Sequence, residues 1–305
     1  MMNTSSMRRS RAGSFAGAVA VLVIFFSATL HASIIDSGDL LTVSSSRTLK
    51  SYTFDGTLIA TLPITGLPLG GISGQPQGVS VIDNRLFIGL VSASNLYSPK
   101  IVEVNPTTGG VISTLDTVAP HLTALGDDGT NLLLLDSVPT TPWQVYTYST
   151  SGTLVSQTSM DRHFPLNFQG EGIDSDGTSI FMSGQTATYP GQPVITNTTA
   201  GLYMSDFNTN MLPLVSFIGG LAYDQNDDTL WIAGNSEFRQ FSRTGTLLSV
   251  VNTGLGNDGV TGLEIISPSI LESVPEPSSL VLLGIGTASL SVVAIRRRRQ
   301  QKSIV

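Results

Sequence analysis

Two short segments of the chain place a carboxylate among glycines and branched aliphatic residues. They are Gln169-Gly170-Glu171-Gly172-Ile173 and Thr261-Gly262-Leu263-Glu264-Ile265. If Glu171 and Glu264 face each other, their oxygens suit Ca²⁺, or one of them can serve as a base toward a metal-bound water. Gln77 and His121 are further polar candidates for the same ligand site. The alternative is that each carboxylate is solvated at a strand end or accepts a hydrogen bond from a turn N–H.

A third acidic segment resembles the start of a calcium-binding loop. Asp224-Gln225-Asn226-Asp227-Asp228 has the D-x-N-x-D spacing, but Thr229 and Asn235 stand where such loops need Gly and Glu. A hairpin turn explains this segment better, because Asp and Asn favour tight turns. We interpret Asp127-Asp128-Gly129 and Asp174-Ser175-Asp176-Gly177 in the same way.

Other catalytic chemistries lack their residues. The 305-residue chain has no Cys, which excludes a disulfide framework, a zinc ribbon and a thiol nucleophile. It has no G-x-S-x-G motif and no phosphate-binding glycine loop. Without a complete catalytic set, the sequence favours a binding or structural role over an enzyme, with no cofactor unless Ca²⁺ binds.

The elements that must position these residues are short β-strands. Between Ile34 and Ser267 no stretch of ten residues has a helical period. Strand-like runs alternate instead with turns such as Asp83-Asn84-Arg85 and Asp55-Gly56. The runs pair into hairpins, and two successive hairpins give four strands. In one such unit we expect Leu202 to Ser205 as the third strand and Leu212 to Phe217 as the fourth.

The repeat of these units predicts an all-β propeller. From Gly56 to Gly245 the second turn advances about 47 residues per unit, which suits propeller blades. The first unit, Leu40 to Leu62, lacks an inner strand, while Gly262 to Ile266 is a strand without a unit. Placing the last strand in the first blade closes a ring of five four-stranded blades and removes two exposed edges. Six blades are the alternative if Ile64 to Gly78 hides a hairpin, and a β-sandwich is the structural rival.

Within such a ring the two carboxylate segments become inner strands. Their pattern loosely resembles the inner strands of calcium-dependent hydrolase and lactonase propellers. That resemblance implies a metal held by carboxylates in the central channel. The Asn and Asp ligands that complete the family's site have no counterparts that can be assigned in this sequence. A calcium-dependent hydrolase or lyase is therefore the alternative to a binding module.

The N-terminal segment predicts export. Arg8 to Arg11 is basic, Phe15 to Phe26 is apolar, and small residues such as Ala28 and Ala32 follow. This is the layout of a secretory signal peptide, which we place at residues 1–33. The apolar run is short for a permanent membrane anchor.

The C-terminal segment, residues 271–305, predicts a second targeting signal. Pro275-Glu276-Pro277 precedes an apolar stretch from Leu280 to Ile295, and Arg296, Arg297, Arg298 and Arg299 follow. Such a stretch predicts a transmembrane helix of about 24 Å whose arginines remain cytoplasmic. The three parts in this order resemble the PEP-CTERM sorting signal of Gram-negative bacteria. The resemblance implies an exosortase as partner, transient inner-membrane anchoring, and release of the body to the cell surface or extracellular matrix.

The body between the two targeting signals, residues 34–270, is acidic. From residue 34 to 274 it has 7 Lys and Arg against 21 Asp and Glu, a net charge of −14. This charge repels nucleic acid, so we expect a surface protein or extracellular polysaccharide as partner. Trp143 packs between blades or, if exposed, stacks on a sugar ring.

Overall fold

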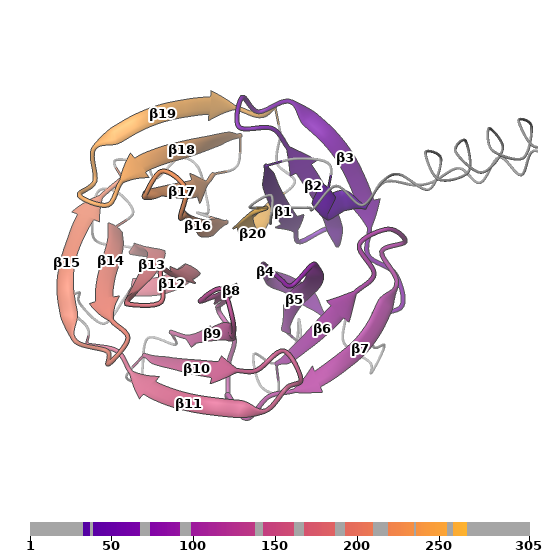
Figure 1. Cartoon of the computed structure of the whole chain (residues 1–305), viewed down its shortest axis with the longest axis horizontal. Coiled ribbons are helices and arrows are strands. Elements are labelled where there is room, and N and C mark those ends of the chain that lie inside the picture. Colours follow the sequence, from indigo (N-terminus) through magenta and orange to yellow (C-terminus); the bar gives the residue numbers. More distant parts are fainter. Residues whose placement is uncertain are drawn as a thin grey trace, which may run out of the picture. The chain divides into compact units, whose positions relative to one another are not determined.

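The chain folds into five four-stranded antiparallel sheets arranged as the blades of a β-propeller (Figure 1). The computed structural model describes residues 33–36, 39–67, 74–91, 99–137, 143–161, 168–186, 193–209, 219–234, 236–254 and 259–266. A short 3-10 helix, η1 (Ile34–Asp36), precedes the first strand. The prediction of an all-β propeller with five blades is confirmed, and the six-bladed ring and the β-sandwich are wrong.

Each blade runs from an innermost strand at the axis to an outermost strand at the rim (Figure 1). Blade one contains β20 (Val260–Ile265), β1 (Leu40–Ser44), β2 (Thr48–Tyr52) and β3 (Leu58–Pro63). Blade two contains β4 (Gln75–Ile82), β5 (Arg85–Val91), β6 (Lys100–Val104) and β7 (Val111–Asp116). Blade three contains β8 (Ala124–Asp127), β9 (Leu132–Asp136), β10 (Gln144–Tyr148) and β11 (Leu154–Ser159). Blade four contains β12 (Phe168–Ser175), β13 (Ser179–Thr186), β14 (Pro193–Thr198) and β15 (Tyr203–Asn208), and blade five contains β16 (Gly220–Asp224), β17 (Thr229–Ala233), β18 (Glu237–Ser242) and β19 (Leu247–Asn252).

The last strand closes the ring as the sequence predicts. β20 pairs antiparallel with β1, so that Ile265 lies opposite Leu40 and Gly262 opposite Val43. Blade one is therefore built from both ends of the body. This pairing covers the inner edge of β1 and gives β20 a partner in the same sheet.

The core is divided among the five interfaces between blades. One buried apolar cluster, for example, joins Leu135 and Trp143 of blade three to Ile173 and Met182 of blade four. Four similar clusters occupy the other interfaces. Trp143 is buried, which confirms packing between blades and excludes the exposed sugar-stacking position. Folding therefore depends on every blade contacting two neighbours.

Blade four corrects the strand prediction. Its third strand is β14, and the segment expected as the third strand, Leu202 to Ser205, lies largely in its fourth strand, β15. The turn between β14 and β15 contains Gly201 at φ +84°. The predicted strand Leu212 to Phe217 lies outside the described residues. Pro, Thr and Asn in Pro193–Thr198 are typical of loops, and the neighbouring strands override that local preference.

The turns between third and fourth strands lock each blade to the one before it. Each contains a glycine at φ between +72° and +87°, and these are Gly56, Gly109, Gly152, Gly201 and Gly245. A Cβ on Gly56 would meet Val251 of blade five at 2.5 Å, and one on Gly201 would meet the Ser159 carbonyl of blade three at 2.1 Å. Only glycine combines this backbone conformation with such close approach.

Candidate functional site

Each innermost strand contributes one glycine at the place where it contacts the next innermost strand. These axis glycines are Gly78, Gly126, Gly172, Gly220 and Gly262. A Cβ on any of them would lie 2.0 to 2.6 Å from a backbone atom of the next innermost strand around the ring. Adjacent inner strands thus approach each other backbone to backbone at this level.

The axis glycines separate two ends of the ring. We call the end where β20 finishes at Ile265 the tail face, because the C-terminal segment continues from it. The far face is the opposite end, where β20 begins at Val260. β1 begins at the tail face, since Leu40 pairs with Ile265. Both ends of the body therefore emerge from the tail face.

On the tail-face side of the axis glycines lies a buried group of acidic side chains. Asp127, Asp174 and Glu264 follow the axis glycine of their strand by one or two residues, and Ser80 has the equivalent position in β4. All four residues are buried. We call this group the axial carboxyl cluster.

Hydrogen bonds connect the cluster across blades. Ser80 Oγ donates to Asp127 Oδ2 over 2.7 Å, and the Gly129 N–H donates to Asp127 Oδ1 over 2.8 Å. Asp174 accepts the Tyr223 N–H over 2.6 Å and the Ser175 N–H over 2.9 Å. The backbone N–H of Asp127 also donates to Asp174, while Asp127 and Glu264 share a side-chain hydrogen bond. The innermost strands of all five blades are thus joined through three carboxyl groups.

Burial determines the protonation of the cluster. Burial, reinforced by the charges of Asp127 and Asp174, raises the pKa of Glu264 well above its ordinary value. Burial likewise raises the pKa of Asp127 to about 6, although the Ser80 hydroxyl and the Gly129 N–H oppose the shift. Burial and the charge of Asp127 raise the pKa of Asp174. Glu264 is therefore the protonated partner, and its O–H donates a hydrogen bond to Asp127. Two ionised carboxylates buried side by side would repel each other.

The other predicted site residues lie on the far side of the axis glycines. Gln77 and Glu171 each immediately precede an axis glycine, at a β-bulge where the register of their inner strand shifts. Glu171 precedes its glycine by one residue and Glu264 follows its own by two, so their levels differ by about 10 Å along the strands. The structure does not bring the two carboxylates together at one ligand position.

His121 belongs to a separate group in blade three. It precedes β8 at the far face, and its Nδ1 lies 3.3 Å from Oδ1 of Asp136, the last residue of β9. Asp136 is buried. The burial of Tyr146 raises the pKa of its hydroxyl, and the charge of Asp136 raises it as well. Across the described parts of the chain, no three His, Asp or Glu side chains are placed to hold a metal ion.

The sequence analysis missed Asp127 and Asp174 because both begin turn motifs. That interpretation holds for their neighbours. Asp128 accepts the N–H groups of Thr130 and Asn131, and Asp176 accepts those of Thr178 and Ser179. Asp127 ends β8 and Asp174 is the last residue but one of β12, and both carboxyls also bond to a neighbouring inner strand. Their position one or two residues after a glycine was the available signal.

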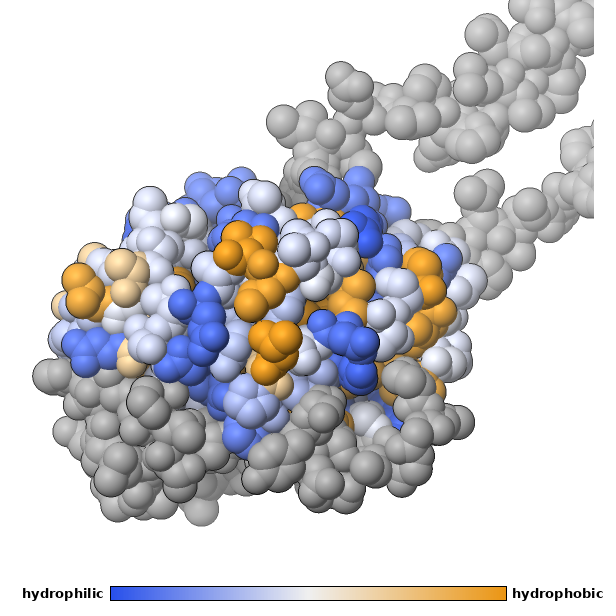
Figure 2. Space-filling view, turned by 90° about the horizontal axis from the view of Figure 1, so that it is seen from below, coloured by the Kyte–Doolittle hydropathy of each residue, from blue (hydrophilic) through white to orange (hydrophobic). Residues whose placement is uncertain are grey.

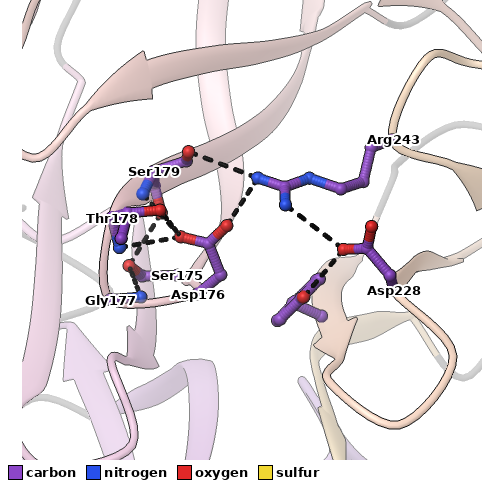
Figure 3. Close-up of polar contacts among 8 residues, drawn as sticks. Ser175, Asp176, Gly177, Thr178, Ser179, Asp228 and Arg243 are labelled. Atoms are coloured by element: carbon purple, nitrogen blue, oxygen red, sulfur yellow. Dashed lines mark hydrogen bonds and ion pairs between the residues drawn. The ribbon is translucent and has the colours of Figure 1, made fainter.

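A second cross-blade contact lies at the turns of blades four and five (Figure 3). Arg243 of blade five donates to Asp176 and Ser179 of blade four and to Asp228 of its own blade. Its guanidinium also lies 5.1 Å from the centroid of the Phe181 ring. The planar donor fork thus joins two turns while stacking on an aromatic face.

Comparison with known proteins identifies the C-terminal segment. Residues 273–299 match the PEP-CTERM protein-sorting motif, which confirms the predicted resemblance and includes Pro275, Glu276, Pro277 and the four arginines. The predicted transmembrane helix and the signal peptide lie outside the described residues. Among the residues that are described, no helix has the length and apolar character needed to cross a membrane.

Solved structures resemble the body only distantly. Glutaminyl cyclase from Myxococcus xanthus is 13% identical, with a TM-score of 0.44 over 58% of this chain and 70% of that chain. A nidogen/laminin complex is 9% identical, with a TM-score of 0.46 over 75% of this chain and 98% of that chain. The Dos1 propeller is 11% identical, with a TM-score of 0.39 over 72% of this chain and 57% of that chain. No curated protein sequence matches the chain.

All three TM-scores are below 0.5, so the assignment of the fold rests on the five sheets of the chain itself. The motif is a substrate signal for exosortase processing and marks an exported, membrane-anchored precursor. The chain is an exported five-bladed β-propeller that carries a PEP-CTERM sorting motif.

Proposed function

We propose that this protein is a cell-surface module that binds extracellular polysaccharide through the far face of its propeller. The observation that carries the proposal is that both ends of the body emerge from the tail face. From Ile266 to Pro275 the chain spans at most about 30 Å. The tether of the anchored precursor therefore starts from the tail face, and the far face is the side of the ring that the tether leaves unobstructed.

The far face offers polar groups that suit a polyhydroxylated ligand. Gln77 and Glu171 occupy equivalent bulge positions before the axis glycines, and Thr261 occupies the same position in blade one. All three are partly accessible to solvent. An amide, a carboxylate and a hydroxyl at one level provide the donors and acceptors that fix a sugar. His121 adds a further donor or acceptor beside blade three.

The axial carboxyl cluster supports a structural role for the other acidic residues. Its oxygens accept hydrogen bonds from backbone N–H groups and from Ser80, and the axis glycines lie between it and the far face. These carboxyls hold the ring together. The binding groups are consequently sought on the far face alone.

The test measures binding of the processed protein, purified from exporting cells, to surface polysaccharide from the same cells. Co-sedimentation is expected for the wild type and is expected to be weakened in a Gln77→Ala, Glu171→Gln variant. Asp116→Asn, on the exposed rim, is the matched control and should bind as the wild type. Equal binding of both variants, or capture of another surface protein in place of the polysaccharide, contradicts the proposal.

Calcium dependence distinguishes the alternative of a hydrolase or lyase. In the binding proposal, chelation with EDTA followed by addition of Ca²⁺ leaves the melting temperature nearly unchanged. A large reversible rise with Ca²⁺ that disappears in Glu171→Gln would instead support the calcium-dependent enzyme.

A further inference from the structure

The same position in all five outermost strands holds an exposed apolar side chain. In each blade the pairing of the third and fourth strands shifts by one residue near the turn, which leaves a β-bulge. In blade one, for example, Tyr52 lies opposite Leu58 and Ser51 opposite Ala60, so Ile59 is the extra residue. The five extra residues, which we call the rim bulge residues, are Ile59, Ile112, Val155, Met204 and Leu248. Their side chains are 45% to 58% exposed.

The surrounding strands lack the charges that normally protect an exposed edge. β3, β11 and β19 contain no charged residue, and β7 and β15 contain one Asp each. Lysine and other charges on edge strands are a common defence against association. Viewed edge-on, the rim shows apolar patches separated by hydrophilic ones (Figure 2). The bulges twist the edges away from extended strand pairing, so the apolar side chains themselves are the available contact.

We infer that the rim bulge residues form a lateral contact surface through which copies of this chain pack side by side. One outermost strand exposes only a few apolar side chains, whereas a stable dimer buries about 800 Å² on each partner. A single rim contact is therefore too small for a tight, discrete complex. Five equivalent contacts on one disc are suited to many weak, simultaneous contacts.

Anchoring favours a second copy as the occupant. The sorting motif anchors every precursor to the same membrane, so other copies of this chain are neighbours that each rim can meet. Copies confined to one surface also meet at high local concentration, which strengthens weak contacts. This inference goes beyond polysaccharide binding and does not depend on it, because it involves the rim and not the far face.

The acidic body sets the salt dependence of the contact. With a net charge of −14 between residues 34 and 274, copies repel one another at low ionic strength. Raising the salt from about 0.05 M to about 0.5 M shortens the Debye length well below the separation of most surface charges. Association through uncharged rims should therefore strengthen as salt is added, whereas association through ion pairs should weaken.

Sedimentation velocity of the processed protein tests the inference. The weight-average mass of the wild type should rise with protein concentration and with salt. Replacing all five rim bulge residues by Ser should lower the association constant by at least about tenfold, because every rim contact then loses its buried apolar side chains. A two-site variant, Val155→Ser with Leu248→Ser, should show an intermediate loss and guards against misfolding of the full variant. Val118→Ser is the matched control, because Val118 is 66% exposed but lies outside the outermost strands.

Cross-linking on the membrane provides the second measurement. The chain has no Cys, so a single Val155→Cys or Leu248→Cys substitution introduces one thiol per copy. Mild oxidation of anchored precursors should yield disulfide-linked dimers with either substitution and few with Val118→Cys. A wild type that stays monomeric at all concentrations and salts, or equal cross-linking at Val118, overturns the inference.

Discussion

Glu264 of the last strand lies opposite Leu41 of the first strand, and its carboxyl O–H donates a hydrogen bond to Asp127 two blades away. One residue thus takes part both in the ladder that closes the ring and in the polar contacts at its axis. Closure of the ring and assembly of the axial carboxyl cluster are consequently a single event. Changes that loosen β20 should weaken both.

The approach of the inner strands predicts that Gly262→Ala destabilises the ring. A Cβ at this position would lie 2.6 Å from Gly78 Cα and 2.8 Å from Val79 N, and both are backbone atoms that cannot move aside. We expect a loss of about 1–3 kcal/mol in the free energy of unfolding, measured by urea denaturation. Gly74→Ala is the control, since its Cβ would make ordinary contacts at 3.6 Å. Equal stability of the two variants would show that the inner strands have room to separate.

The axial carboxyl cluster predicts that stability falls as the pH rises. In the unfolded chain these carboxyls titrate near their ordinary values, whereas in the fold burial raises the pKa of Asp127 to about 6 and that of Glu264 well above its ordinary value. Between about pH 4 and pH 6 the folded state therefore binds more protons than the unfolded chain, and raising the pH removes stability. The shift at Asp127 corresponds to a contribution on the order of 3 kcal/mol, present below pH 4 and lost by pH 7.

Glu264→Gln tests this pH dependence, because glutamine keeps a hydrogen-bond donor toward Asp127 but cannot lose a proton. Urea denaturation at a series of pH values should give a flatter profile for the variant between pH 4 and pH 7. The free energy of unfolding of the variant should rise relative to that of the wild type as the pH approaches neutrality. Parallel profiles for both proteins would mean that Glu264 does not hold its proton in the fold.

Loss of the Arg243 contacts should loosen blade four from blade five. Arg243→Met removes the hydrogen bonds to Asp176 and Asp228 and the stacking on Phe181. Because the guanidinium is partly exposed, we expect only about 1 kcal/mol of destabilisation, seen as a lower melting temperature. Lys100→Met breaks an exposed ion pair with Asp116 inside blade two and should have almost no effect. A larger effect of Lys100→Met than of Arg243→Met would contradict this ranking.

Processing of the sorting motif should leave the ring intact. We expect mass spectrometry of the released protein to find a C-terminus between Pro275 and Pro277. This position lies beyond Ile266, so β20 is kept in the product. Replacing Pro275, Glu276 and Pro277 by alanine should retain the protein in the membrane fraction. A released protein that still extends to Val305 would rule out cleavage at this site.

The sequence predicted the features of the fold that depend on local residues. Turn glycines such as Gly56, Gly152 and Gly245, and the unpaired strand at Gly262, were sufficient to give five blades and their closure. Blade four was assigned wrongly because Pro193–Thr198 has a loop-like composition and becomes a strand only between its neighbours. Pairing with β13 and β15 makes this segment a strand, and the residues of the segment alone do not indicate that pairing.

The candidate site was predictable only in part. Glu264 was identified as an inner-strand carboxylate, but its partners Asp127 and Asp174 also satisfy the rules for turns. The bulges at Gln77 and Glu171 shift the alternation of side chains along the inner strand by one position. The direction in which a side chain points therefore depends on these bulges. A bulge results from pairing between strands, so a single strand cannot reveal it.

The place of β20 at the end of the body also fixes the order of events during synthesis. Ribosomes make Val260–Ile265 after the other nineteen described strands, so blade one stays incomplete until nearly the whole body has been synthesised. The sorting motif follows β20 in the sequence, so the segment that exosortase recognises is made directly after the strand that completes the ring.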